Sequence, residues 1–215
     1  MTDISGRLAA CYTGVLHDVM RGSDLHDFTL PPELRPLFPE KSMAGPAFTI
    51  EGKVAPGTDA HDTLLAWTGL LSKAPAGTIW VSQPNDRVVA HMGELSAETL
   101  KGKGLRGCVV DGLIRDVNFI LKIGFQVWSR GSTPRDIVGY WLPAVTNTTI
   151  RIGDVAIASG DYLVGDRDGL VRVPKLLAED ITTKAEAAMG TESRVRQAIL
   201  DGVGPQEAYL KYGKF

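Results

Sequence analysis

Cysteine, long apolar runs and an excess of either charge are all scarce in this sequence. Its two cysteines, Cys11 and Cys108, form no disulfide framework, so we expect reduced, buried thiols in a cytoplasmic protein. No uncharged run approaches the roughly 20 apolar residues of a membrane-spanning helix. The N-terminal stretch MTDISGRLAACYTG lacks the basic and apolar regions of a secretory signal. These absences predict a chain with no membrane partner.

Basic clusters and the familiar cofactor motifs are missing as well. The 23 Lys and Arg residues against 25 Asp and Glu residues leave a formal net charge of −2, so we expect no nucleic acid partner. No GxGxxG motif follows an expected strand, and the P-loop, GxSxG and HExxH motifs are absent. No metal-ligand spacing relates the histidines, which we interpret as surface or core residues: His17, His26, His61 and His91.

What the sequence does contain is typical of a soluble globular domain. The chain has 215 residues, 44% of them apolar and 22% charged, which is enough to bury a sizeable core. Apolar residues at three-to-four spacing predict a helix over residues 4–20. Prolines at four positions between residues 31 and 39 exclude a helix interior and a central strand, and predict an extended surface crossing.

Strand and helix patterns alternate through the middle of the chain. Period-two alternation predicts a half-buried strand over 46–54, and the later patterns predict strands at 79–81, 108–110 and 125–129 between helices at 61–72, 94–103 and 117–123. That order indicates βαβ units and a largely parallel sheet. Turn residues then separate apolar runs over 144–173, which predicts hairpins. The apolar spacing from Pro174 onward predicts helices.

The segment from Val109 to Asp116 is the first that contains candidate functional residues. A buried strand enters a glycine turn and is followed by the adjacent opposite charges Arg115 and Asp116. Ligands of α/β sheets bind beyond the carboxyl ends of strands, which is where these residues are expected. The alternative is purely structural: Asp116 caps the helix that begins at 117, and Arg115 is solvated.

A second segment, His91 to Glu98, places Gly93 at the start of a helix. Free backbone N–H groups at a helix start can hold a carboxylate, although Glu94 in the first turn is also what the helix dipole alone favours. Other acidic positions have simpler interpretations. Asp166 and Asp168 are typical hairpin-turn residues, and Asp111 can serve only to hold its turn.

Together the two segments resemble one family. Glu94, twenty intervening residues and then Arg115-Asp116 match its acidic-x20-Arg-Asp signature, and the stretch GELSAETLKGKGLRGCVVDGLIRD resembles the 4-hydroxy-4-methyl-2-oxoglutarate aldolases. These are class II, metal-dependent pyruvate aldolases related to the RraA-like regulators of ribonuclease activity. GPAFTI and GDVAIASGDYLVGDRDGLVRVP extend the resemblance over most of residues 4–190.

The resemblance implies an α/β fold, a swivelling β/β/α sandwich whose mixed sheet has flanking helices and C-terminal helices. It implies a single domain over 1–190 and a homotrimer or homohexamer with its active site at the subunit interface. Residues 191–215 are expected to form a helical extension that packs either on its own subunit or on a neighbouring one. The resemblance also implies that the substrate carboxylate is bound by a loop formed by Gly93, Glu94, Leu95 and Ser96. Arg115 binds the pyruvyl keto oxygen, Asp116 binds Mg²⁺ or Mn²⁺, and a neighbouring subunit supplies Glu192.

The implied chemistry is retro-aldol cleavage of a small-molecule 2-keto acid through a metal-stabilised pyruvate enolate, with oxaloacetate decarboxylation as a side activity. A metal-ordered water oriented by Glu94 would take the hydroxyl proton. Glu94 departs from the Asp expected at this position, and the extra methylene can alter rate or substrate. Two alternatives stay open: a non-catalytic regulator of the RraA type that binds a protein partner, and a lyase of the same scaffold acting on a different acid.

Overall fold

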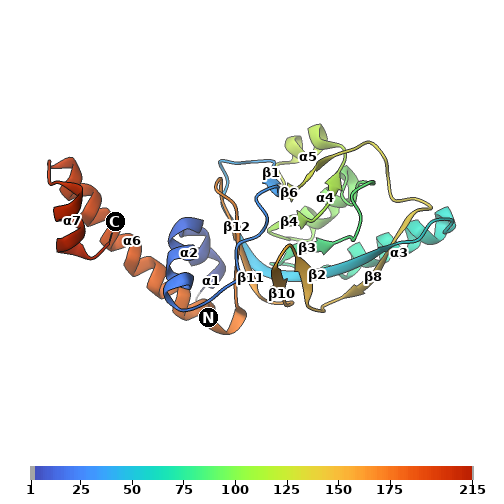
Figure 1. Cartoon of the computed structure of the whole chain (residues 1–215). Coiled ribbons are helices and arrows are strands. Elements are labelled where there is room, and N and C mark those ends of the chain that lie inside the picture. The colour runs from blue at the N-terminus through green and yellow to red at the C-terminus, as the bar shows by residue number, and fades with distance from the viewer. Residues whose placement is uncertain (1–2, 215) are drawn as a thin grey trace.

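A computed structural model describes residues 3–214 as three layers built around one mixed sheet (Figure 1). The eight strands of the sheet run in the order β1-β6-β4-β3-β2-β11-β12, with β8 also pairing with β2. Their bounds are Arg35–Pro36 (β1), Met43–Val54 (β2), Ile79–Gln83 (β3), Gly107–Val110 (β4), Val127–Ser129 (β6), Trp141–Thr146 (β8), Tyr162–Gly165 (β11) and Leu170–Val173 (β12).

The centre of this sheet is parallel, as the strand and helix order predicts. β2, β3, β4 and β6 are parallel neighbours, and β1, β8, β11 and β12 add antiparallel edges. The proline-rich crossing supplies β1, which lies at the sheet edge, where a missing N–H is tolerated. The register of the β2–β8 pairing shifts between Glu51 and Gly52. Glycine is needed at position 52 because a Cβ there would lie 1.8 Å from the Trp141 ring.

Three helices cover one face of the sheet: α3 (Ala60–Lys73), α4 (Glu94–Gly102) and α5 (Val117–Ile123). The hairpin of β9 (Ile150–Ile152) and β10 (Val155–Ile157) packs on the opposite face. The layers therefore follow the expected β/β/α order. The prediction of a half-buried strand at 46–54 is wrong for residues 47–50, which are all buried, because both faces of β2 are covered.

The predicted single helix over 4–20 is in fact two helices, α1 (Ile4–Ala10) and α2 (Thr13–Gly22). Cys11 and Tyr12 are extended between them. Asp166, in the β11–β12 turn, accepts 2.7 Å hydrogen bonds from both the backbone N–H and the hydroxyl of Thr13. This cap comes from a distant hairpin, so the local periodicity could not reveal it. Cys11 and Cys108 are buried free thiols, and burial raises both their pKa values.

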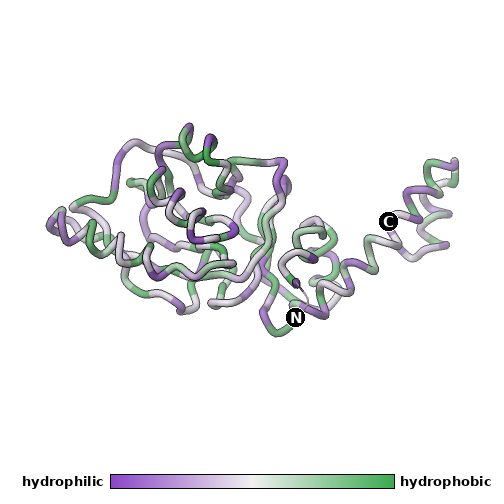
Figure 2. Tube along the Cα trace, turned by 180° about the vertical axis from the view of Figure 1, so that it is seen from behind, coloured by the Kyte–Doolittle hydropathy of each residue, from purple (hydrophilic) through white to green (hydrophobic). Residues whose placement is uncertain are grey.

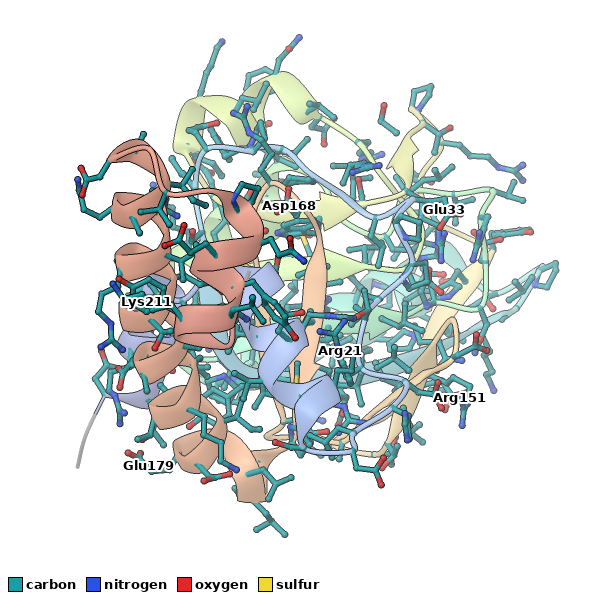
Figure 3. All side chains as sticks on the ribbon, turned by 60° about the vertical axis from the view of Figure 1, so that its left-hand side comes forward. Arg21, Glu33, Arg151, Asp168, Glu179 and Lys211 are labelled. Carbon is teal, nitrogen blue, oxygen red and sulfur yellow. The ribbon has the colours of Figure 1, made fainter. Side chains whose placement is uncertain are left out.

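The chain ends in a short 3₁₀ turn (η1, Lys175–Leu177), the long helix α6 (Ala178–Leu200) and α7 (Pro205–Tyr212). α6 packs beside α1 and α2 and then projects away from the sheet, with hydrophobic and hydrophilic residues mixed along it (Figures 1 and 2). Figure 3 shows Arg21 on α2 and Lys211 on α7 at this end of the molecule. Among the described residues no helix is long and apolar enough to cross a membrane. Residue 190, the expected end of the domain, lies inside α6.

Candidate active site

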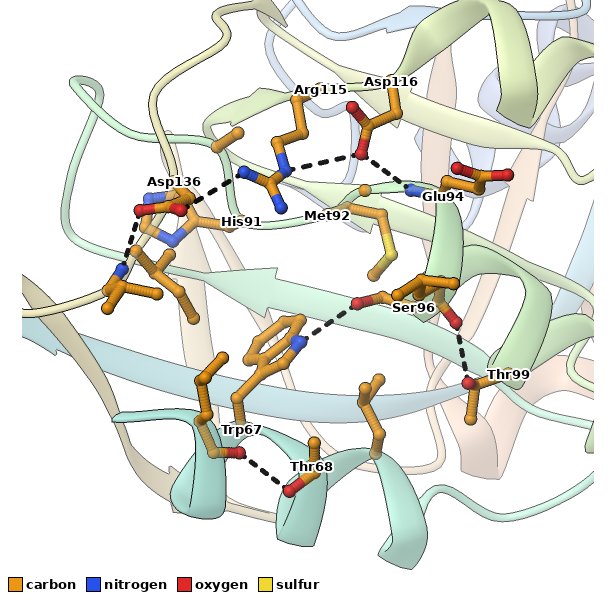
Figure 4. Close-up of a pocket in the computed structure, with 17 residues that line it drawn as sticks. Trp67, Thr68, His91, Met92, Glu94, Ser96, Thr99, Arg115, Asp116 and Asp136 are labelled. Atoms are coloured by element: carbon orange, nitrogen blue, oxygen red, sulfur yellow. Dashed lines mark hydrogen bonds and ion pairs between the residues drawn. The ribbon is translucent and has the colours of Figure 1, made fainter. Parts of the chain in front are cut away.

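A cleft of about 560 Å³ opens beyond the carboxyl ends of β3 and β4 (Figure 4). One wall comes from the loop that leads into α4 and from the residues that follow β5 (Leu113–Ile114), a short strand paired with β7 (Gly131–Ser132). α3 forms the facing wall. The six residues expected to bind substrate or metal all line this cleft: Gly93, Glu94, Leu95, Ser96, Arg115 and Asp116.

Asp116 occupies the N-cap position of α5 but does not cap that helix. Its side chain makes no cap hydrogen bond there, and its backbone is left-handed, with φ of +57° and ψ of +34°. Instead Oδ2 accepts a 3.2 Å hydrogen bond from the backbone N–H of Glu94, at the start of α4. The simple capping interpretation is therefore wrong. The side chain is directed across the cleft wall, and sparsely populated backbone conformations of this kind cluster at functional sites.

Arg115 is held between two carboxylates and is not simply solvated. Its Nε lies 3.4 Å from Asp116 Oδ2, and its Nη1 lies 3.4 Å from Asp136 Oδ2. The side chains of Arg115 and Asp116 are 39% and 37% exposed, so both remain open to a ligand. Sequence reasoning missed Asp136. It lies in a loop whose fold is fixed by an Asx turn, with Oδ1 accepting from the Val138 N–H at 3.1 Å, and no local spacing links it to Arg115.

Gly93 permits the close approach of the two segments. A Cβ at this position would lie 2.7 Å from Asp116 Oδ2 and 3.2 Å from Arg115 Nε. The ladder of α4 begins with the bond from Ala97 N–H to Gly93 O, at 2.9 Å, so the amides of residues 94–96 stand outside it. The first of these amides, the N–H of Glu94, donates to Asp116 Oδ2. The amides of Leu95 and Ser96 can receive an anion, such as a substrate carboxylate.

His91 lies buried beneath the cleft, paired with Asp86. Its Nε2 is 3.0 Å from Asp86 Oδ2, which also accepts from the backbone N–H groups of Val88 and Val89. Burial lowers the pKa of His91 even though Asp86 raises it. Burial would raise the pKa of Asp86, but the Val89, Val88 and His91 hydrogen bonds outweigh it and lower that pKa. Nε2–H therefore donates to Asp86, and the buried Nδ1 has no partner among the described residues.

The interpretation of His91 as a core residue is confirmed, but its position at the cleft was not foreseen. The available signal was a single titratable residue inside the apolar run Val88-Val-Ala-His-Met92. Such a residue must find a buried partner.

Glu192 lies far along the chain from this cleft, on α6. Its carboxylate is 3.1 Å from Lys214 Nζ, which is also 3.0 Å from Asp18 Oδ2. These contacts join α6 to the C-terminal residues and to α2. The prediction that Glu192 serves a neighbouring subunit's cleft stays a prediction.

The carboxylate oxygens in the cleft are suitable ligands for a divalent cation whose other ligands are mainly water and substrate. No group of three His, Cys, Asp or Glu residues that could hold a metal occurs within residues 3–214. Asp116 still offers Oδ1, which accepts no hydrogen bond from the described residues, and Glu94 and Asp136 are nearby carboxylates on the same wall. Mg²⁺ is commonly bound through one or two carboxylates with several waters, so a single fixed ligand is sufficient.

A family model and a curated relative point to the same group. A family model described as RraA-like, Aldolase/RraA, matches residues 13–172. A Halalkalibacterium halodurans protein named "Putative 4-hydroxy-4-methyl-2-oxoglutarate aldolase" is 31% identical over 180 residues, 83% of this chain and 81% of the relative. A solved structure titled as novel cellulases from gut-associated microbes is 30% identical, with a TM-score of 0.84 over 90% of this chain and 88% of the other.

The RraAS2 protein of Streptomyces coelicolor, titled as an unusual member of the RNase ES inhibitor RraA family, is 24% identical. Its TM-score is 0.81 over 91% of this chain and 96% of the other. At that identity the likeness shows a shared fold and nothing more.

Proposed function

The chain belongs to the RraA-like family, and on that premise we propose that it is a divalent-metal-dependent lyase that releases pyruvate from a 4-hydroxy-2-keto acid. One observation supports this proposal most strongly. The side chains of Arg115 and Asp116 lie on the same cleft wall as the backbone N–H groups of Leu95 and Ser96, which stand outside the helical hydrogen bonds of α4. A 2-keto acid presents a carboxylate and an adjacent keto oxygen, and these groups match an anion-binding helix start beside a guanidinium.

Cleavage breaks the C3–C4 bond of the substrate. The C4 hydroxyl loses its proton and becomes the carbonyl of the leaving aldehyde or ketone. The bonding electrons pass to C3 and form the pyruvate enolate, which then takes a proton at C3. The negative charge develops on the keto oxygen, where the Arg115 guanidinium donates. Arg115 remains charged at all relevant pH values, so it can stabilise this oxygen throughout.

Asp116 would hold Mg²⁺ or Mn²⁺, and the ion when bound would supply Lewis-acid polarisation of the keto group. Glu94 is placed in the first turn of α4, on the same wall. We assign to it the orientation of the water that accepts the C4 hydroxyl proton, with Glu192 of a neighbouring subunit in a trimer or hexamer as a second carboxylate. Loss of CO₂ from oxaloacetate yields the same enolate, so this activity requires no additional residue.

The test is metal-dependent pyruvate release. The purified protein is given oxaloacetate and, separately, 4-hydroxy-4-methyl-2-oxoglutarate, with Mg²⁺ or with chelator. Release from at least one acid is expected with metal, and Asp116→Ala and Arg115→Ala should abolish it while circular dichroism stays unchanged. Asp168→Ala, in an exposed hairpin turn, is the matched control and should retain full activity.

Two outcomes would contradict parts of this proposal. Turnover by a folded Asp116→Ala protein would refute the metal-binding role of that residue. A folded wild-type protein that releases pyruvate from neither acid with metal supplied would favour one of two other interpretations: a regulator that binds a protein partner without catalysis, or a lyase of this scaffold that acts on a different acid.

A further inference from the structure

Charge in the cleft is concentrated on one wall. The charged residues that line it are Glu94, Arg115, Asp116 and Asp136, and Figure 4 shows all four along the same side. Arg115 is the one permanent cation among the described residues that line the cleft. His91 also lines it but is buried and neutral, because burial lowers its pKa. In the proposed reaction, Arg115 is already committed to the pyruvyl half of the substrate.

The facing wall is apolar and offers few free polar groups. Trp67 and Leu71 of α3 are buried there, and Leu64 of the same helix is half-exposed; Met92 and Ile137, from other segments, are further buried apolar residues that line the cleft. Two hydroxyls that line the cleft, one on α3 and one on α4, are already used by their own helices. Thr68 donates to Leu64 O and Thr99 donates to Leu95 O, both at 2.7 Å.

Ser96 belongs to α4, but its side chain contacts this wall. Its hydroxyl oxygen accepts from Trp67 Nε1–H at 3.0 Å, so its own proton remains available for one hydrogen bond. A single neutral hydroxyl supplies no counter-charge for a carboxylate.

We propose that the part of the substrate beyond C4 is an apolar aliphatic or aromatic group, so that the enzyme cleaves 4-hydroxy-2-keto monocarboxylic acids in preference to dicarboxylic ones. This inference rests on the proposed function and specifies its substrate class. With the pyruvyl half against Arg115, the far end of the substrate meets α3. An apolar group there gains from leaving water, whereas a second carboxylate would be desolvated with no cation beside it.

The same wall is compatible with oxaloacetate decarboxylation. The carboxylate of oxaloacetate that faces α3 is the group that leaves as uncharged CO₂. Desolvation of that carboxylate is relieved as the bond breaks. Oxaloacetate activity therefore does not argue for a stable second carboxylate site.

The first test compares two substrates of matched shape with the wild-type protein. 4-Hydroxy-5-methyl-2-oxohexanoate carries an isopropyl group where 4-hydroxy-2-oxoglutarate carries a carboxylate, and the two groups have the same number of heavy atoms. We expect kcat/KM for the isopropyl substrate to be larger by roughly tenfold or more, in line with the discrimination that a pocket achieves against an unpaired polar group. A preference for the dicarboxylate would overturn the inference.

The second test places a cation on the apolar wall. Leu64 and Leu65 are adjacent on α3 and are 49% and 60% exposed, but Leu64 lines the cleft and Leu65 lines a separate cavity with Pro143 and Val145. Leu64→Lys should shift the ratio of kcat/KM values toward the dicarboxylate by about tenfold. Leu65→Lys, the matched control, should leave the ratio at the wild-type value. An unchanged ratio in a folded Leu64→Lys protein would contradict the assignment of this wall.

Exchange of the methyl protons of pyruvate in D₂O tests the proposed lyase function independently of the proposed substrate class. The exchange needs only the pyruvyl half of the site. Metal-dependent exchange with a dicarboxylate preference would overturn the substrate class and retain the lyase. A folded, metal-supplied protein that shows no exchange and no cleavage would overturn both.

Discussion

Two Arg–Asp pairs lie close together in this chain and behave in opposite ways. Asp111, directly after β4, contacts Arg130 Nε, and their side chains are only 13% and 10% exposed. Arg115 and Asp116 meet at 3.4 Å and are each more than a third exposed. The first pair is close to fully satisfied and joins the residue after β4 to the residue after β6. The second has unused hydrogen-bonding capacity at an open cleft, which is where a ligand can be bound.

Unused hydrogen-bonding capacity therefore marks the functional pair better than residue type does. The sequence presents Asp111 and Asp116 five positions apart, with similar surroundings. Asp111 pairs with Arg130, which follows β6, so its carboxylate is neutralised within the fold. Asp116 could have capped α5, but its left-handed backbone directs the carboxylate to α4 and Arg115 instead.

The largest effect should come from removing the charge of Asp116 alone. Asn keeps an acceptor for the Glu94 N–H and tolerates a left-handed backbone, so the fold should be preserved. We expect Asp116→Asn to lower kcat/KM for metal-dependent pyruvate release by about 10³-fold, as loss of a key electrostatic group does. Steady-state kinetics with saturating Mg²⁺ measures it. A loss of less than fivefold would remove the distinction between the two pairs.

The same substitution at Asp111 should affect stability and not catalysis. Asp111→Asn leaves Arg130 largely buried without its main counter-charge, which typically costs about 3 kcal/mol of unfolding free energy. Urea denaturation measures that cost, and kcat/KM should stay within about twofold of wild type at a temperature where the variant is folded. Strongly reduced activity in the folded variant would mean that this pair also belongs to the site.

Gly93→Ala tests how closely the second pair must be positioned. The added Cβ would lie 2.7 Å from Asp116 Oδ2, so the carboxylate must move. Because the backbone at Gly93 is extended, with φ of −140°, Ala introduces no backbone strain. A displacement approaching 1 Å should lower kcat/KM by about 10²-fold with little change in stability. The matched control is Gly102→Ala in the last turn of α4, where a Cβ meets nothing within 4 Å; this variant should retain full activity.

The smallest effect concerns the buried Asp86–His91 pair. The pKa of His91 is lowered in the folded chain, so the unfolded chain binds more protons below about pH 6.5. The stability that neutral His91 contributes is therefore complete above that pH and is lost as the pH falls toward the folded pKa. The lowered pKa of Asp86 adds a similar loss below about pH 4.

His91→Gln keeps a donor toward Asp86 and removes the titrating ring. It should flatten the decrease in melting temperature between pH 7 and pH 5, as measured by differential scanning fluorimetry. A decrease identical to that of the wild type would show that other groups cause the acid sensitivity.

Local signals accounted for much of the fold. The parallel strands, the helices at α3, α4 and α5, and the two late hairpins were all predictable because each is marked by its own periodicity and turn residues. The break at Cys11 was not, because the cap that ends the pattern comes from Asp166, 153 positions from Thr13. Interactions over such separations leave no trace in a local window.

The site divides in the same way. Gly93, Glu94, Arg115 and Asp116 belong to two short motifs with a fixed spacing, so they could be found together. Asp136 and His91 could not, since their roles depend on a loop and a buried pair that only the folded chain brings to the cleft. The apolar character of the α3 wall likewise depends on which side of that helix faces Arg115, which periodicity alone does not specify.

Exchange of the pyruvate methyl protons in D₂O, followed by proton NMR, tests most directly whether the open Arg115–Asp116 pair stabilises a pyruvate enolate. The closed Asp111–Arg130 pair should have no such role. We expect Mg²⁺- or Mn²⁺-dependent exchange in the wild type, retention of that exchange in Asp111→Asn, and its loss in Asp116→Asn. Absence of exchange in the folded wild type with metal, or undiminished exchange in Asp116→Asn, would contradict this expectation.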